Sequence, residues 1–332
     1  MHIKTLIFGA LLAVSGPALA AGEIVLKFSH VVAPATPKGK AADKFGELAA
    51  KYTNGKVKVE VYPNSQLYKD REEVEALQLG AVQMLAPSLS KFGPLGAREM
   101  EVFDLPYILP NKAALYEAMD GAVGKVLLNK LESKGILGLA YWDNGFKVMS
   151  ANKPLKTPAD FAGLKMRIQS SKVLEAQMKA LGAIPQVMAF SEVYTALQQG
   201  VVDGTENPPS NLYTQKMHEV QKHVTLSDHG YLGYAVIVNK AFWLNLPDDV
   251  RAGLEKAMKE ATAYEREIAQ KDNDDAMAAV KAAGTSQIHS LSDAEKAAWR
   301  AALEPVHKEF ESVVGADNLA AFKAIAAKHD KK

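Results

Sequence analysis

The chain has 332 residues, with 39 lysines and arginines, 38 aspartates and glutamates, and no cysteine. The lack of cysteine excludes disulfides, cysteine-ligated metals and thiol catalysis. The balanced charge, without a basic run interleaved with aromatic residues, argues against binding to nucleic acid or to a membrane surface.

The first twenty residues have the pattern of an export signal. A short basic start precedes an apolar run at residues 6–14, and Ala18, Leu19 and Ala20 form the small-x-small pattern at which signal peptidase cuts. An uncleaved membrane anchor is the alternative, but the apolar run is shorter than the ~20 residues that a spanning helix needs. We therefore expect a signal peptide at residues 1–20, cleavage after Ala20, and a periplasmic protein that is not embedded in the membrane.

Short strands alternate with helices along the rest of the chain, which predicts an α/β fold with mostly parallel sheets. The expected strands are at residues 24–28, 57–61, 82–86, 135–141, 164–169 and 231–239. The expected helices are at residues 37–52, 70–79, 172–180 and 248–283, with two more closing the chain. The chain is longer than a single hydrophobic core usually supports, so we expect two lobes joined by strands and by the long helix.

The sequence lacks common motifs for catalysis, nucleotide binding and metal binding. The sequence has no dinucleotide-binding glycine motif, no Walker A motif and no nucleophile elbow. His218 and His223 are five residues apart, whereas a zincin needs a spacing of four, so we predict that both lie on a helix surface or edge. We therefore predict no metal, no cofactor and no enzymatic activity, with a periplasmic hydrolase as a remote alternative.

Arg167 is the leading candidate for binding an anion. It stands at the C-terminal end of an expected strand, and Ser170 and Ser171 directly begin a helix. Ligands bind at the C-terminal ends of strands in open α/β sheets, and helix N-termini favour anions. An arginine can hold a carboxylate with two charge-assisted hydrogen bonds. The alternative is a surface arginine on an edge strand.

Three further residues stand at positions suited to the same site. Asn207 precedes two prolines that fix the backbone, Phe190 comes just before a helix cap, and Lys147 follows the strand at 135–141. The amide of Asn207 could donate to a carboxylate, and Lys147 could supply a second cation. The alternatives are a plain turn at Asn207, a hydrophobic staple at Phe190, and a solvated loop lysine at Lys147.

An ordered set of segments resembles the solute-binding subunit of TRAP transporters. The segments are residues 62–67, 105–107, 165–171, 188–198 and 202–208. The resemblance is closer to the DctP-type C4-dicarboxylate-binding branch. The stretches that indicate this branch are residues 28–32, 36–39 and 207–211.

This resemblance implies roles for particular residues. Arg167 would form the main salt bridge to a ligand carboxylate, Asn207 would help to hold the same group, and Phe190 would pack on the ligand. Many family members have a second arginine where this chain has Lys147, and lysine lacks the planar fork of arginine. Further candidates by position are His30, Lys38, Ser88, Ser90, Ser170 and Tyr213.

The resemblance also implies a two-lobed periplasmic-binding-protein architecture with a long helix that spans both lobes. We expect lobe I at residues 21–143 and 232–270, and lobe II at residues 144–231 and 271–330, with the ligand cleft between them. The lobes would close on succinate, malate or fumarate, and the closed form would dock on the small and large membrane subunits. The alternative ligand is another carboxylate, such as a 2-oxo acid or a sugar acid.

Overall fold

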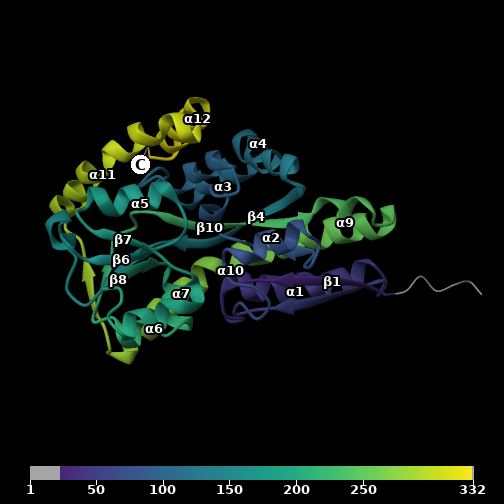
Figure 1. Ribbon diagram of the computed structural model, residues 1–332, viewed down its shortest axis with the longest axis horizontal. Coiled ribbons are helices and arrows are strands. Elements are labelled where there is room, and N and C mark those ends of the chain that lie inside the picture. The colour runs from purple at the N-terminus through teal and green to yellow at the C-terminus, as the bar shows by residue number, and fades with distance from the viewer. Residues whose placement is uncertain (1–22, 331–332) are drawn as a thin grey trace, which may run out of the picture.

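The computed structural model describes residues 23–330, which form two lobes, each built on its own β-sheet (Figure 1). The predicted export signal lies outside the described residues. Within residues 23–330, no helix is both long enough and apolar enough to cross a bilayer. The mixture of helices and strands in two lobes confirms the predicted fold class.

The strands of the first lobe are β1 (Ile24–Ser29), β2 (Val57–Tyr62), β3 (Met84–Leu85), β4 (Ile136–Phe146) and β10 (Tyr231–Asn239). They form a sheet of order β2-β1-β3-β10-β4. Strands β2, β1 and β3 run parallel, and β10 is antiparallel to both β3 and β4. Strand β4 continues five residues beyond its predicted end, because its later residues pair with the first half of β10.

The strands of the second lobe are β5 (Val148–Ala151), β6 (Lys165–Ile168), β7 (Ile184–Val187), β8 (Gly204–Asn207), β9 (His223–Leu226) and β11 (Gln287–Ser290). They form a sheet of order β11-β9-β5-β8-β6-β7. Strand β6 runs parallel to both β7 and β8, and β5 is antiparallel to β8 and β9. The C-terminal ends of β6 and β8 therefore lie side by side.

Helices cover both sheets. Those of the first lobe are α1 (Pro37–Tyr52), α2 (Glu72–Gln78), α3 (Lys112–Asp120), α4 (Ala122–Asn129) and α9 (Lys240–Leu244). Those of the second lobe are α5 (Lys172–Ala180), α6 (Val193–Gln198), α7 (Pro209–Thr214) and α8 (Met217–Val220). Three helices end the chain: α10 (Asp248–Ala283), α11 (Asp293–Val314) and α12 (Ala316–His329). The 3-10 turns are η1 (Leu89–Lys91), η2 (Arg98–Asp104), η3 (Lys130–Lys134), η4 (Pro158–Phe161) and η5 (Phe190–Glu192).

Two helix starts follow from local chemistry. The hydroxyl of Thr36 accepts a hydrogen bond from the backbone N–H of Gly39, and Pro37 takes the first helical position of α1. The hydroxyl of Ser171 accepts from the backbone N–H of Leu174 at the start of α5. The cap at Ser171 was predicted, because a hydroxyl residue before a periodic apolar pattern indicates where a helix begins.

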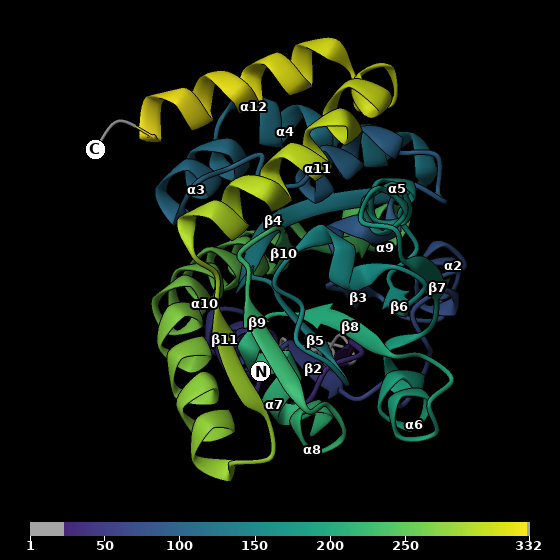
Figure 2. The same ribbon diagram turned by 90° about the vertical axis from the view of Figure 1, so that its left-hand side faces the viewer.

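The lobes are joined by two strand crossings and by α10. Lys147 alone separates β4 from β5, and residues 227–230 join β9 to β10. Helix α10 passes along one side of the molecule (Figure 2) and packs on α1 and β4 of the first lobe and on α7 of the second. Its residue Leu254 belongs to the first-lobe core and Val280 to the second-lobe core. The predicted spanning helix is therefore present.

The C-terminal helices depart from the predicted lobe boundaries, which placed residues 271–330 in the second lobe. The start of α11 packs there through Trp299 and Leu303. Helix α12 instead lies over α3 and α4 of the first lobe (Figures 1 and 2). Its Phe322 ring meets the Phe103 ring edge-on, with centroids 4.9 Å apart. An amphipathic helix does not itself specify which apolar core it joins, so the sequence pattern could not place α12.

Candidate ligand-binding site

Arg167 lies inside the second-lobe sheet, because β6 is flanked by β7 and β8. Only 2% of its surface is exposed, which excludes the alternative of a surface arginine. Its Nε and Nη2 donate to the carbonyl of Met188 at 3.1 and 2.9 Å, and the Phe190 ring centroid lies 5.7 Å from its Cζ. Burial lowers the pKa of the guanidinium, which still remains protonated at neutral pH.

A small cavity of about 20 Å³ lies between the lobes next to Arg167; we call it the inner cavity. Its first-lobe walls are Val31, Val32, Lys38, Asp70, Ser88, Lys91, Leu232 and Tyr234. Its second-lobe walls are Arg167, Gln169, Phe190, Asn207 and Asn211. The predicted residues Arg167, Asn207, Phe190, Lys38 and Ser88 are thus brought together. The cavity also holds Asp70, Lys91, Gln169, Asn211 and Tyr234, which were not predicted as site residues. Gln169 and Asn211 stand in the segments 165–171 and 207–211 that indicate the family, which was the available signal, whereas no local motif includes Asp70, Lys91 or Tyr234.

Direct contacts between the lobes enclose the inner cavity. The backbone N–H of Phe190 donates to the Asp70 carboxylate at 2.6 Å, and the hydroxyl of Ser88 donates to the side chain of Gln169. Nearer the surface, Lys69 forms an ion pair of 2.7 Å with Glu192. Each contact joins a first-lobe residue to a second-lobe residue, so the structure represents the two lobes closed on one another.

A larger cleft of about 770 Å³ lies outside these contacts and is lined by both lobes. It shares Asp70, Lys91, Arg167 and Gln169 with the inner cavity. The predicted site residue Ser170 lines this outer cleft and not the inner cavity. The inner cavity and the outer cleft therefore adjoin at these four shared residues.

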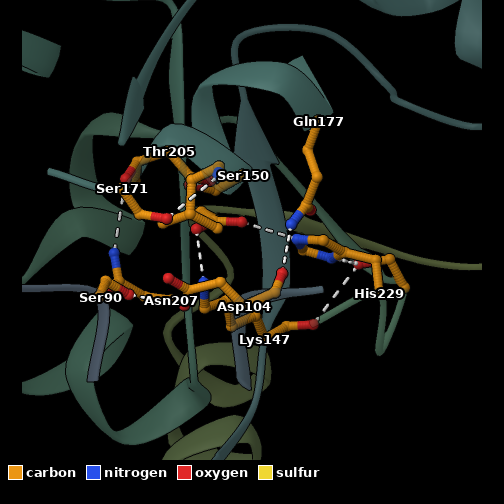
Figure 3. A network of polar contacts seen from close by, with 12 residues as sticks. Ser90, Asp104, Lys147, Ser150, Ser171, Gln177, Thr205, Asn207 and His229 are labelled. Atoms are coloured by element: carbon orange, nitrogen blue, oxygen red, sulfur yellow. Dashed lines mark hydrogen bonds and ion pairs between the residues drawn. The ribbon is translucent and has the colours of Figure 1, made fainter. Parts of the chain in front are cut away.

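Lys147 does not line the inner cavity. Its ammonium lies 2.6 Å from Glu206 Oε1, and Glu206 Oε2 lies 2.8 Å from Nε2 of His229. Lys147 and His229 both belong to the polar network of Figure 3. Burial alone would raise the pKa of Glu206, but Lys147 and His229 outweigh it and lower that pKa to about 2. Side chains alternate along a strand, so Asn207 faces the cavity while Glu206 faces away toward Lys147. The second cation expected at Lys147 is therefore neutralised within the protein.

Two other predicted residues are buried near the cavity without lining it. Ser90 donates to Asp104 Oδ1 at 2.7 Å, within the polar network of Figure 3. His30 has no hydrogen-bond partner on either ring nitrogen among residues 23–330. Burial and the nearby Lys38 lower the pKa of His30 to about 3, so its imidazole is neutral.

The remaining predicted residue, Tyr213, is 40% exposed and stacks on His218 with ring centroids 5.1 Å apart. His218 is buried on α8, and His223 belongs to β9, where its Nδ1 lies 2.9 Å from Nε2 of His289. The prediction that both histidines lie on a helix surface or edge is wrong, because the chain turns from helix to strand at Gln221. Among residues 23–330, no three histidine or acidic side chains gather as a metal site would require.

The buried cations differ in whether a carboxylate neutralises them. Within the described part of the chain, the buried lysines and arginines are Lys38, Lys91, Lys147 and Arg167. Lys91 pairs with Asp70 and with Glu73, and Lys147 pairs with Glu206. Lys38 and Arg167 have no carboxylate partner among residues 23–330, and both line the inner cavity from opposite lobes. The cavity is therefore lined by two cationic side chains, Lys38 and Arg167, that have no ion-pair partner in the described part of the chain.

The direct contacts of Lys38 within residues 23–330 are with neutral groups. Its ammonium donates to the carbonyl of Ala86 at 2.9 Å and lies 3.7 Å from the centroid of the Tyr234 ring. Burial and the charge of Lys91 lower the pKa of Lys38 to about 7, against a weaker opposing effect of Glu73. An anion in the cavity would favour the charged form of this lysine.

Two lobes that close over a cavity with uncompensated charge define a protein that binds a small solute. Residues 28–313 match the family model described as bacterial extracellular solute-binding protein, family 7, DctP. The chain belongs to this family, the periplasmic solute-binding proteins of TRAP transporters. This finding confirms the resemblance on which the site predictions depended.

The alignments with similar proteins cover nearly the whole chain. A C4-dicarboxylate-binding periplasmic protein of Rhodobacter capsulatus is 69% identical over 316 residues, which is 95% of either chain. A TRAP solute-binding protein from Sulfurospirillum deleyianum, solved with bound succinate, is 51% identical with a TM-score of 0.89, covering 92% of this chain and 99% of that one. Another from Pseudomonas aeruginosa, solved with bound L-malate, is 45% identical with a TM-score of 0.84, covering 86% and 99%.

Proposed function

We propose that this protein captures C4-dicarboxylates such as succinate, malate and fumarate in the periplasm and delivers them to the membrane subunits of a TRAP transporter. The observation that carries the proposal is the pair of buried, uncompensated cations, Arg167 and Lys38, on opposite lobes of one cavity. A ligand with a carboxylate at each end neutralises both charges. Relatives and structural neighbours with such ligands support the same class.

Each end of the ligand has its own partners in this proposal. Arg167 and Asn207 hold one carboxylate, and Phe190 packs on the ligand beside them. Lys38 takes the second carboxylate, in the role that the sequence analysis expected of Lys147. Because the two cations come from different lobes, the ligand stabilises the closed arrangement. Binding changes no covalent bond.

The binding free energy available from so small a ligand requires that the protein surround it. Succinate has roughly eight heavy atoms, so at about 1.5 kcal/mol per atom the most it can gain is ~12 kcal/mol. Micromolar affinity needs about 8 kcal/mol. Most ligand atoms must therefore be contacted, which two lobes that close around the ligand allow and an open surface does not.

The test is calorimetric titration of the mature protein with succinate, malate and fumarate, with butyrate as a monocarboxylate of the same chain length. We expect micromolar binding of the dicarboxylates and at least a hundredfold weaker binding of butyrate, since butyrate leaves Lys38 unpaired. Absence of heat with all three dicarboxylates would overturn the ligand class. A sugar acid that bound more tightly than all three would favour the alternative carboxylate.

Export and delivery need a cellular test. Cells that lack the protein should lose dicarboxylate uptake, and the chain with residues 1–20 should restore it. Mass spectrometry of the periplasmic protein should give a start at Ala21. The same chain without residues 1–20 is the control, and uptake restored by that control would contradict the proposed periplasmic role.

A further inference from the structure

Two polar atoms of the inner cavity walls, Asn211 Oδ1 and Tyr234 Oη, are buried without a hydrogen-bond partner among residues 23–330. Asn211 lies on α7 of the second lobe, and Tyr234 on β10 of the first. Each residue is 2% exposed. Buried polar atoms in folded proteins nearly always have a partner, so two such atoms in one cavity indicate groups that a ligand satisfies.

The two groups lie close together and have complementary chemistry. Burial raises the pKa of Tyr234 far above its ordinary value, and the Asn211 side chain, which comes within hydrogen-bonding reach of the phenol oxygen, opposes this shift. The phenol therefore keeps its proton at neutral pH and can donate, while the Asn211 carbonyl oxygen can only accept. The ammonium of Lys38, proposed above to hold the second carboxylate, lies over the Tyr234 ring.

The chemistry of the ligand decides whether both atoms can be satisfied. At neutral pH, succinate and fumarate are dianions with acceptor oxygens only, so they can accept from Tyr234 but cannot donate to Asn211. A hydroxyl group accepts and donates at the same time. A hydroxyl on the carbon next to a carboxylate would therefore satisfy both buried atoms.

We infer that Asn211 and Tyr234 together recognise a hydroxyl group of the ligand, so that the protein prefers a 2-hydroxy C4-dicarboxylate such as malate to succinate. The hydroxyl donates to Asn211 Oδ1 and accepts from Tyr234 Oη. This inference rests on the proposed function and adds specificity to the same cavity. A site built to bond a hydroxyl discriminates against an analogue without it, because its own polar groups are then left unpaired.

The first experiment needs no mutation. Calorimetry compares L-malate, succinate and 2-fluorosuccinate, whose fluorine has nearly the size of a hydroxyl but cannot donate. We expect malate to bind about tenfold more tightly than either of the others, which is the effect of one buried hydrogen bond. Equal affinity for all three would overturn the inference and leave the proposed function standing. Binding of none of them would overturn the proposed function itself.

Two variants then assign the effect to residues. Asn211→Leu removes the acceptor at similar volume, and the malate-to-succinate affinity ratio should fall from about ten to about one. Tyr234→Phe removes only the hydroxyl and keeps the ring beneath Lys38, so it should also lower this ratio. An unchanged ratio in folded Asn211→Leu would overturn the assignment. If that variant does not fold, the comparison of malate with 2-fluorosuccinate in the wild-type protein decides.

Discussion

The Lys147 ammonium and the Glu206 carboxylate are 2.6 Å apart and almost fully buried. This ion pair links the crossing between β4 and β5 to β8, the strand that carries Asn207. Glu206 also meets His229 on the second strand crossing. The charge of Lys147 therefore stabilises the junction of the lobes. In the part of the chain that the structure describes, Lys38 is the cation without an ion-pair partner that faces Arg167.

We expect the contributions of Lys147 and Glu206 to the free energy of unfolding to be strongly coupled. Lys147→Met leaves Glu206 buried with His229 alone and should lower the free energy of unfolding by about 3–5 kcal/mol. Glu206→Gln should cost a similar amount, whereas the double variant should cost clearly less than the sum. Urea unfolding of the four proteins in a double-mutant cycle measures this coupling. Strictly additive losses would show that the two side chains act independently.

Arg167→Met should change the stability of the protein little and its ligand affinity strongly. The guanidinium is buried without a carboxylate partner, so its removal should change the free energy of unfolding of the ligand-free protein by no more than about 1 kcal/mol. The same change should weaken dicarboxylate binding by at least a hundredfold, since two charge-assisted hydrogen bonds are lost. Urea unfolding and calorimetry give the two values. Wild-type affinity in the variant would remove Arg167 from the site.

The protonation of Lys38 should make ligand affinity depend on pH. Its pKa is about 7 in the ligand-free protein, and a bound dianion should raise it. Below about pH 7 the lysine is already charged, so affinity should be nearly constant. Above about pH 7 binding must take up a proton, so affinity should fall by up to tenfold per pH unit. Calorimetry in buffers of different ionisation enthalpy detects this uptake.

Lys38→Arg is the matched control, because arginine stays protonated throughout this range. Its affinity should be independent of pH between about 7 and 9. A dependence equal to that of the wild type would assign the proton to another group. The first to consider is Glu101, whose pKa burial and the charge of Asp104 raise to about 7.

Asp70 should control how long the lobes stay closed. Asp70→Ala leaves the backbone N–H of Phe190 without its acceptor in the closed form, which should cost about 1–3 kcal/mol of closure. Affinity should fall roughly tenfold to a hundredfold, mainly through faster dissociation. Lys69→Ala breaks the neighbouring contact to Glu192, in which both side chains are about half exposed, and should change affinity less than fivefold. Stopped-flow fluorescence measures the rate of ligand dissociation from both variants and from the wild type. A wild-type dissociation rate in Asp70→Ala would contradict a role for Asp70 in closure.

The sequence by itself determined the features that depend on neighbouring residues. Apolar spacing located α5 at residues 172–180 and α10 at residues 248–283, as the structure has them, and the hydroxyl cap at Ser171 marked the start of α5. Arg167 was recognised from its place between a strand end and a helix cap, and parallel pairing of β6 with β8 brings it near Asn207. Local spacing suffices here because hydrogen bonds in helices and side-chain alternation in strands repeat over a few residues.

Only the tertiary structure decided which buried cations have a carboxylate partner and which do not. Lys147 and Glu206 are 59 residues apart in the chain, and no local pattern indicates that β5 and β8 bring them together. Lys38 and Tyr234 come from distant elements of the first lobe, and Asn211 of the second lobe meets them only because the lobes close. Whether a buried cation binds a ligand or an internal carboxylate depends on such long-range contacts. Residue spacing could therefore nominate the cations, but folding determined that Lys38 and Arg167 face the cavity unpaired.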